Sequence, residues 1–137
     1  MALAVLSALG CWTPGPAGLK AELQTARTAF AQGDTFKGTF TIRNTRAFPV
    51  RTEIRELPAY ELDVYDENDS VVLRCPGVHL AEITELELGP WGTASYDVGF
   101  ALCNDPGLEP LPVGDYRIRA RLVYCPEPHD DLNIRVE

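Results

Sequence analysis

One stretch of the sequence, residues 114–124, contains charged and apolar side chains that alternate from Asp115 to Leu122. Tyr116 and every second residue after it are apolar or aromatic, whereas Arg117, Arg119 and Arg121 occupy the positions between them. A period of two is the repeat of a strand with one buried face, because a helix needs a period of about 3.6 residues. Such a strand is stable only in a sheet whose apolar face packs on another layer.

The same alternation recurs from about residue 19 onwards and predicts eight or nine short strands, with turn-forming residues roughly every ten positions. This spacing predicts the all-β class, as an immunoglobulin-like antiparallel β-sandwich formed by residues 19–137. Tyr116, at the start of its strand, is expected to bind nearby backbone through its hydroxyl. The apolar faces predict a core of Phe36, Phe40, Ile42, Leu62, Val64, Tyr96, Val98, Ile118, Ala120 and Leu122.

The first part of the chain, residues 1–18, has a different character. Residues 1–10 are apolar apart from Ser7, and they precede Cys11 and a linker rich in Pro and Gly. An apolar run that ends at a cysteine resembles a bacterial lipoprotein signal, in which Cys11 carries the lipid anchor. This favours the cell envelope or an extracytoplasmic location over the cytoplasm. The alternative is a segment that packs on the domain, and the run is too short to span a bilayer.

The charge and the motifs limit the classes of function. The 137 residues carry a formal net charge of −8, which argues against a nucleic-acid or anionic-membrane partner because both would repel the chain. The sequence has no Gly-x-Ser-x-Gly nucleophile elbow and no Gly-rich phosphate loop of either standard kind. We therefore expect neither an enzyme nor a bound cofactor.

Four cysteines, at positions 11, 75, 103 and 125, raise the question of disulfides. If the chain is exported, disulfides are allowed. The strand of residues 71–75 returns as a hairpin from the strand that starts at Tyr60, which places Cys75 beside the start of that strand. If the strand of residues 94–100 pairs antiparallel with it, Cys103 lies at the same edge. The sequence therefore predicts a Cys75–Cys103 disulfide.

Two motifs of the sequence contain side chains that can bind metal ions. Cys75 to His79 and Cys125 to His129 both read Cys-Pro-x-x-His, and two cysteines with two histidines suit tetrahedral zinc. The predicted topology puts the two pairs at opposite ends of the sandwich, which argues against that site. The acidic turn of residues 66–69 offers oxygen ligands for Ca²⁺, but Asp and Asn build hairpin turns for backbone reasons alone. We predict no metal site.

Residues 33–125 resemble the BsuPI-like intracellular proteinase inhibitor domain family, a bacterial family of immunoglobulin-like sandwiches. The resemblance rests on the order and spacing of several short motifs: a strand that ends in Asn44, a Pro49-Val50 turn, and a Tyr-x-Leu-x-Val strand with a polar turn. A return strand, a Leu-x-Leu edge and a final Gly-x-Tyr strand follow. These motifs lie at residues 41–45, 49–50, 60–66, 71–74, 86–90 and 111–116.

The resemblance implies a non-catalytic module that docks on a protein, with a protease as the family's partner. Loops at one end of the sandwich are the natural contact sites, and the candidate contact residues are Tyr60, Trp91, Leu108 and Leu111. The alternative is an envelope-anchored structural or accessory domain without inhibitory activity. One exposed apolar patch formed by Trp91, Leu108 and Leu111 would favour the binding role, and scattered placement would favour the accessory role.

Overall fold

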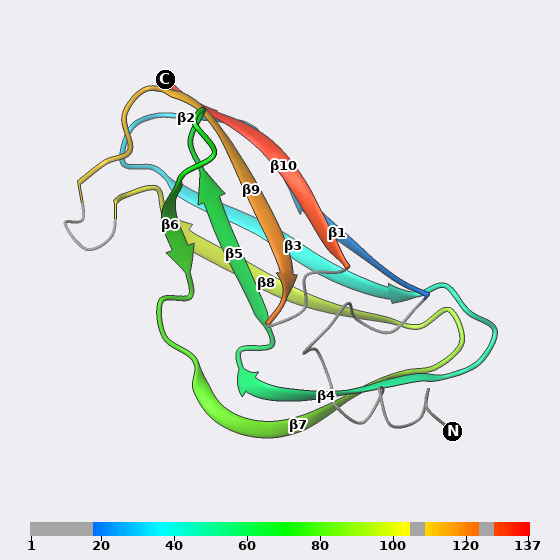
Figure 1. Cartoon of the computed structure of the whole chain (residues 1–137). Helices are drawn as coiled ribbons and strands as arrows, with labels where there is room; N and C mark the ends of the chain where they lie inside the picture. Colours follow the sequence, from blue (N-terminus) through cyan, green and yellow to red (C-terminus); the bar gives the residue numbers. More distant parts are fainter. Residues whose placement is uncertain (1–17, 105–108, 124–127) are drawn as a thin grey trace.

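The computed structural model describes residues 18–104, 109–123 and 128–137, and that part of the chain forms ten strands in three sheets (Figure 1). One sheet has the order β1-β3-β8, a second has the order β2-β10-β9-β5-β6, and β4 and β7 form a two-stranded ribbon. The strands are β1 (Leu19–Thr25), β2 (Ala29–Phe30), β3 (Thr35–Asn44), β4 (Val50–Leu57), β5 (Tyr60–Tyr65), β6 (Val71–Cys75), β7 (Leu80–Leu88), β8 (Thr93–Ala101), β9 (Gly114–Leu122) and β10 (His129–Val136).

The prediction of an all-β, immunoglobulin-like sandwich is confirmed. The strand count exceeds the expected eight or nine by the two-residue β2, which pairs in parallel with the end of β10 at Ala29–Arg135 and Phe30–Val136. A two-residue strand has too few positions to show any alternation, so the sequence carries no signal for it.

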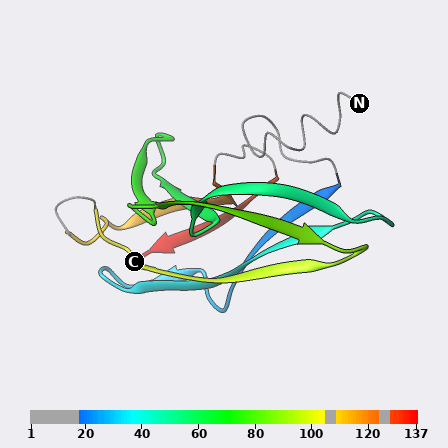
Figure 2. The same ribbon diagram turned by 90° about the horizontal axis from the view of Figure 1, so that it is seen from below.

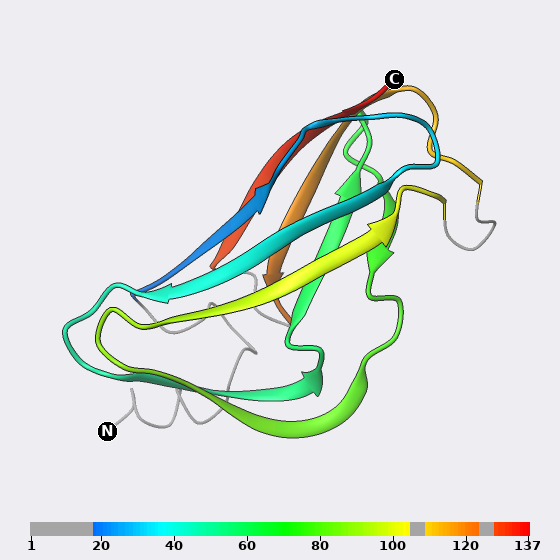
Figure 3. The ribbon, with the colours of Figure 1, turned by 180° about the vertical axis from the view of Figure 1, so that it is seen from behind.

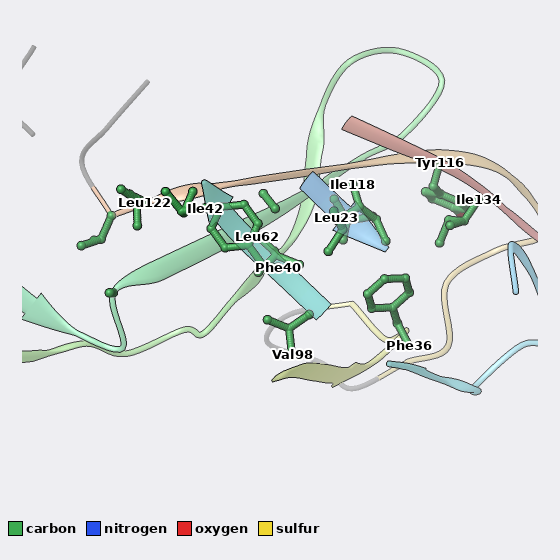
Figure 4. Packing of buried hydrophobic residues seen from close by; sticks show 14 of the residues in the cluster. Leu23, Phe36, Phe40, Ile42, Leu62, Val98, Tyr116, Ile118, Leu122 and Ile134 are labelled. Atoms are coloured by element: carbon green, nitrogen blue, oxygen red, sulfur yellow. The ribbon is translucent and has the colours of Figure 1, made fainter. Parts of the chain in front are cut away.

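The core fills the space between the three-stranded and the five-stranded sheets, as Figures 3 and 4 show. Phe36, Phe40 and Ile42 of β3 face Leu62 of β5 and Ile118 of β9, and all five side chains are fully buried. Nine of the ten residues predicted for the core are buried, and Tyr96 is half-buried against them. The alternating patterns of β3, β5, β8 and β9 therefore placed these core residues correctly.

β9 has the faces that its alternation predicts. Tyr116 and Ile118 are buried, whereas Arg117 and Arg119 lie on the outer face. The Tyr116 hydroxyl donates a hydrogen bond to the Pro112 carbonyl oxygen at 2.6 Å, so the expected bond to nearby backbone is confirmed. Burial raises the pKa of this phenol, and the Asp66 and Glu67 carboxylates raise it further.

We expect Tyr116→Phe to lower the free energy of unfolding by about 1 kcal/mol, because the change removes one buried hydrogen bond and leaves the packing of the ring. Urea unfolding of both proteins measures the difference. Tyr65→Phe is a suitable control, since Tyr65 is half-buried on the outer face of β5 and its hydroxyl makes no hydrogen bond to the described residues. An unchanged midpoint for Tyr116→Phe would contradict the assignment.

The expected pairing of β8 with β5 is wrong. β8 pairs with β3 over Thr35–Ala101 to Arg43–Thr93, and β5 lies between β6 and β9. The error concerns long-range pairing, which apolar alternation does not encode. Outside the strands, Cys103 and Pro110 form an isolated β-bridge.

A corner joins the three-stranded sheet to the ribbon. The β3–β8 ladder ends at Asn44, and beyond it the same two chain segments continue as β4 and β7, from Val50–Leu88 to Leu57–Leu80 (Figure 1). Asn44 is fully buried there, and its side-chain amide nitrogen donates to the carbonyl oxygens of Phe48 and Gly89 at 2.8 and 2.9 Å. Its Oδ1 accepts a bond from the Arg46 amide at 2.9 Å. The Asn44 side chain thus forms hydrogen bonds to both turns of the corner, the one that follows β3 and the one that precedes β8.

Candidate functional site

The exposed apolar side chains gather on one part of the molecule. Among the described residues, seven large hydrophobic side chains are exposed, and five of these lie on the β4–β7 ribbon or on the segments that flank it. We call these five the ribbon surface: Phe48 (55% exposed), Val78 (77%), Leu80 (68%), Ile83 (70%) and Trp91 (64%). Concentrated exposed apolar area is typical of interaction sites, whereas single exposed apolar residues are ordinary.

Part of the β4–β7 ribbon is exposed to solvent because only part of it packs on the sandwich. It runs past the end of the five-stranded sheet at which β5 begins (Figures 1 and 2). On β4, Val50, Thr52 and Ile54 alternate as buried residues, whereas the first four residues of β7, from Leu80 to Ile83, are all exposed. β7 therefore offers a longer accessible stretch than β4.

Trp91 occupies a turn position that a tryptophan rarely takes. The Gly92 amide donates to the Gly89 carbonyl at 2.9 Å, which closes a turn with Pro90 and Trp91 in its centre. Trp91 has φ of 60°. Positive φ at this third turn position normally requires glycine, and a bulky residue there costs on the order of 1 kcal/mol. A side chain kept exposed at that cost fits a functional role better than a packing role.

The opposite end of the ribbon is fixed to the start of β5. The His79 Nε2 atom lies 3.2 Å from the Tyr60 carbonyl oxygen, and its Nδ1 atom lies 3.9 Å from the Glu56 carboxylate. The Tyr60 ring packs 5.6 Å from the Tyr96 ring, and burial raises the pKa of the Tyr60 phenol. These contacts hold β7 at its first residues, between Val78 and Leu80.

The predicted contact residues do not form one group. Trp91 is exposed and belongs to the ribbon surface, Tyr60 is half-buried beside it, and Leu108 lies outside the described residues. Leu111 is fully buried in the core, so its side chain is not available to a partner and cannot join an exposed patch. Cys11, the predicted lipidation site, also lies outside the described residues. Phe48, Val78, Leu80 and Ile83 were not among the residues predicted from the sequence, because exposure beyond the sandwich leaves no local pattern in the sequence.

A second cluster, of charged side chains, covers the outer face of the five-stranded sheet. Glu61 and Asp63 of β5 are buried, and the Arg74 Nε atom lies 2.9 and 2.7 Å from their carboxylates. Arg121 Nη2 lies 3.3 Å from Glu61 and 3.7 Å from Asp63. Since each buried carboxylate faces two guanidinium groups, this cluster is internally compensated and leaves little for a ligand.

The same face continues onto β10. Arg119 makes two hydrogen bonds to the Asp131 carboxylate, at 2.8 and 2.9 Å. These bonds lower the pKa of the Asp131 carboxyl below its ordinary value. The Arg117 guanidinium lies over the Tyr65 ring, 4.6 Å from its centroid. The three arginines of β9 thus contact residues of the neighbouring strands β5 and β10.

Cys75 and Cys103 line the same hollow, although the pairing of β5 with β8 that suggested their proximity is wrong. Both are free thiols in the structure, and each is half-buried. The hollow has a volume of about 250 Å³ and lies between the end of β6 and the end of β8, with Leu73 and Phe100 also in its wall. Burial raises the pKa of the Cys75 thiol, so it is protonated at neutral pH.

We expect the two thiols to form a disulfide when the protein is held in an oxidising buffer. The oxidant in the buffer takes two electrons and two protons from the thiols, so the expected result is an intact mass lower by two hydrogen atoms and no alkylation of Cys75 and Cys103 until reductant is added. Cys103→Ser should restore full alkylation of Cys75, which identifies the pair. Equal alkylation of every cysteine in oxidised, metal-free protein would rule out the bridge.

The metal alternatives gain no support from the described residues. Within residues 18–104, 109–123 and 128–137, no group of three or more His, Cys, Asp and Glu side chains is arranged to hold a metal ion. Cys125 lies outside these ranges, and His129 is the first residue of β10 rather than part of a loop. In the acidic turn, the Asp66 carboxylate accepts hydrogen bonds from the backbone amides of Asn68 and Ser70 at 2.9 and 3.0 Å, as is usual for an aspartate that stabilises a turn.

In the described part of the chain, no helical segment has the length and apolar character needed to cross a bilayer.

Taken together, the sheet order and the packed core define an immunoglobulin-like antiparallel β-sandwich that carries an exposed β-ribbon. No protein-family model matches the sequence, and no curated protein matches it.

Solved structures with the same fold belong to diverse proteins. The chain is similar to the alkylpurine DNA glycosylase AlkC of Pseudomonas fluorescens (TM-score 0.56, 12% identity, 99% of this chain and 33% of that one). It is also similar to the sporulation control protein Spo0M of Bacillus subtilis (0.56, 15%, 89% and 50%) and to a β-glucosidase of Listeria innocua (0.51, 15%, 89% and 16%). The chain therefore spans half or less of each of these proteins, and at such identities the likeness concerns the fold alone.

Proposed function

We propose that this domain is a non-catalytic protein-binding module that contacts its partner through the ribbon surface. The observation that carries the proposal is that five exposed apolar side chains lie on the β4–β7 ribbon or on the segments that flank it: Leu80 and Ile83 on β7, and Phe48, Val78 and Trp91 beside the strands. A partner that covers these side chains removes apolar area from water, at roughly 25 cal/mol per Å². Trp91 supports the same role. Its aromatic side chain is of the kind that is enriched among residues that dominate binding energy, and it is kept exposed although its backbone has a positive φ.

More specifically, we propose that the domain is a proteinase inhibitor of BsuPI type. Residues 80–83 are consecutive, extended and exposed, which is the form in which a peptide segment can pair with another protein through its main chain. The accessory role without inhibition is the second candidate. It is favoured by the burial of Leu111, which prevents Trp91, Leu108 and Leu111 from forming one patch.

Affinity capture with matched baits tests the binding role. The baits are the wild-type chain, the double variant Leu80→Glu/Ile83→Glu, Trp91→Gly, and the control Val113→Glu. Val113 is 61% exposed but lies outside the ribbon surface. Trp91→Gly removes the aromatic side chain and relieves the positive φ, so we expect the turn to stay folded. Circular dichroism verifies that the double variant is folded.

We expect a partner that the wild type and Val113→Glu capture and that both ribbon variants lose. Equal capture by all four baits would place the binding surface elsewhere. The same proteins are then assayed against a panel of proteases. Stoichiometric inhibition that the ribbon variants lose supports the inhibitor, whereas capture without inhibition of any protease supports the accessory role.

A further inference from the structure

The side chains of β7 combine negative charge with exposed apolar surface. β7 carries three acidic residues, Glu82, Glu85 and Glu87, and no Lys or Arg. Glu85 and Glu87 lie 2.7 and 3.2 Å from Arg51 of β4, whereas no ion pair of Glu82 is found among the described residues. The strand therefore combines exposed apolar side chains with uncompensated negative charge at Glu82.

β7 is also an edge strand. Within the described residues β7 pairs with β4 and with no other strand, so the backbone amides and carbonyls along its second side face no strand there. Proteins protect such an edge with inward charges, lysines, prolines, very short strands or β-bulges. β7 has nine residues without Lys or Pro and its first four are exposed, although the register of the β4–β7 pair shifts between Ile54 and Glu56. Apart from this irregularity, the edge is open to a further strand.

We propose that the occupant of this edge is an extended segment of a partner protein in which Lys or Arg alternates with apolar residues, and which adds to β7 as the third strand of the ribbon. The inference rests on the proposed binding role and names the chemistry of the partner. Cross-strand neighbours of opposite charge stabilise a strand pair, and like charges destabilise it. A basic residue of the segment meets Glu82, which has no ion pair among the described residues, while apolar residues of the segment cover Leu80 and Ile83.

Charge also selects against the competing occupant, a second copy of this chain. Two β7 strands would bring three glutamates each to one interface, and each chain carries a net charge of −8. Repulsion between like-charged proteins slows their encounter and weakens their complex, whereas a basic segment is attracted.

Fluorescence anisotropy with labelled peptides and the full chain tests this inference. The probe is an eight-residue peptide that alternates Lys and Val. One comparison peptide replaces every Lys by Glu, and another keeps the charge but replaces two Val by Pro, which prevents strand pairing. We expect the Lys/Val peptide to bind and both comparison peptides to bind at least about tenfold more weakly.

Matched variants of the protein locate the site. Glu82→Lys and Ile83→Lys should each weaken binding of the Lys/Val peptide about tenfold, because lysine on an edge strand blocks addition of a further strand. Glu22→Lys makes the same charge change at an exposed position of β1 and should change affinity less than about threefold at equal salt.

Three results would overturn the inference: equal binding of the proline-containing peptide, equal binding of the glutamate peptide, or equal weakening by Glu22→Lys. A dimer in sedimentation that Ile83→Lys dissociates would assign the edge to a second copy instead. If the capture experiment finds a ribbon-dependent partner but the Lys/Val peptide does not bind, only the chemistry proposed here fails. If no bait variant matters, the binding role itself fails.

Discussion

Asn44→Leu is expected to lower the free energy of unfolding by roughly 4 kcal/mol, the largest effect of any change considered for this protein. Leucine has a similar volume but no polar atoms, so the Phe48 and Gly89 carbonyls and the Arg46 amide all lose their partner. Each buried polar group left without a hydrogen bond costs about 1–3 kcal/mol. Urea unfolding followed by circular dichroism measures the change.

Asn133→Leu is the matched control, because Asn133 is exposed on β10, and we expect it to shift stability by less than about 0.5 kcal/mol. Asn44→Asp separates the two kinds of contact, since it keeps the oxygen that accepts from Arg46 and replaces the donor with a carboxylate. The carboxylate oxygen that replaces the amide nitrogen would face the carbonyl oxygens of Phe48 and Gly89. We therefore expect Asn44→Asp to lower the free energy of unfolding nearly as much as Asn44→Leu. A loss below about 1 kcal/mol for Asn44→Leu would show that water substitutes for the side chain.

Arg121→Met is expected to cost about 3 kcal/mol, at the lower end of the range for breaking a buried ion pair. The Arg121 side chain is 21% exposed and faces Glu61 and Asp63, whose side chains are 9% and 4% exposed. Without it, both carboxylates depend on Arg74, whose side chain is 53% exposed. Thermal or urea unfolding at neutral pH gives the difference.

Two further variants decide whether buried charge is the cause. Arg135→Met removes an arginine that is 62% exposed and 3.7 Å from Asp115, and it should have almost no effect. Adding Glu61→Leu to Arg121→Met removes the carboxylate that has lost its partner, and this should restore most of the lost stability. If the double variant is less stable than Arg121→Met alone, the packing of the arginine stem, and not its charge, is the main contribution.

Much of the fold could be predicted from local patterns, because they act within single strands. The alternation from Tyr116 to Leu122 gave the correct inner and outer faces of β9, and the same reasoning located Phe36, Phe40 and Ile42 in the core. The hairpin of β5 and β6 followed from the polar turn at Asp66. In each case the signal lies within a few neighbouring residues, where side-chain period and turn chemistry act.

The features that were missed depend on contacts between distant segments. Leu111 was predicted to be a surface residue, but its amide bonds to the Leu102 carbonyl and draws the side chain into the core. The continuation of β3 and β8 into the ribbon depends on Asn44, whose partners Phe48 and Gly89 belong to two separate turns. Exposure of β7 arises because the ribbon extends beyond the sandwich, which no local pattern records.

The joint between the two main sheets determines when this domain can finish folding. The Leu23 amide of β1 donates to the Asp130 carboxylate of β10 at 2.7 Å, across 107 positions of sequence. β2 likewise pairs with the final residues of β10. Contacts between such distant segments carry a large loop-closure cost and form late, whereas the β5–β6 hairpin closes locally. During synthesis, β1 therefore lacks its contacts with β10 until the end of the domain has been made, and until then the nascent chain is most open to aggregation or to capture by chaperones. In pulse-labelled hydrogen exchange, the Leu23 amide should gain protection after the amides of β5, and simultaneous protection would contradict this order.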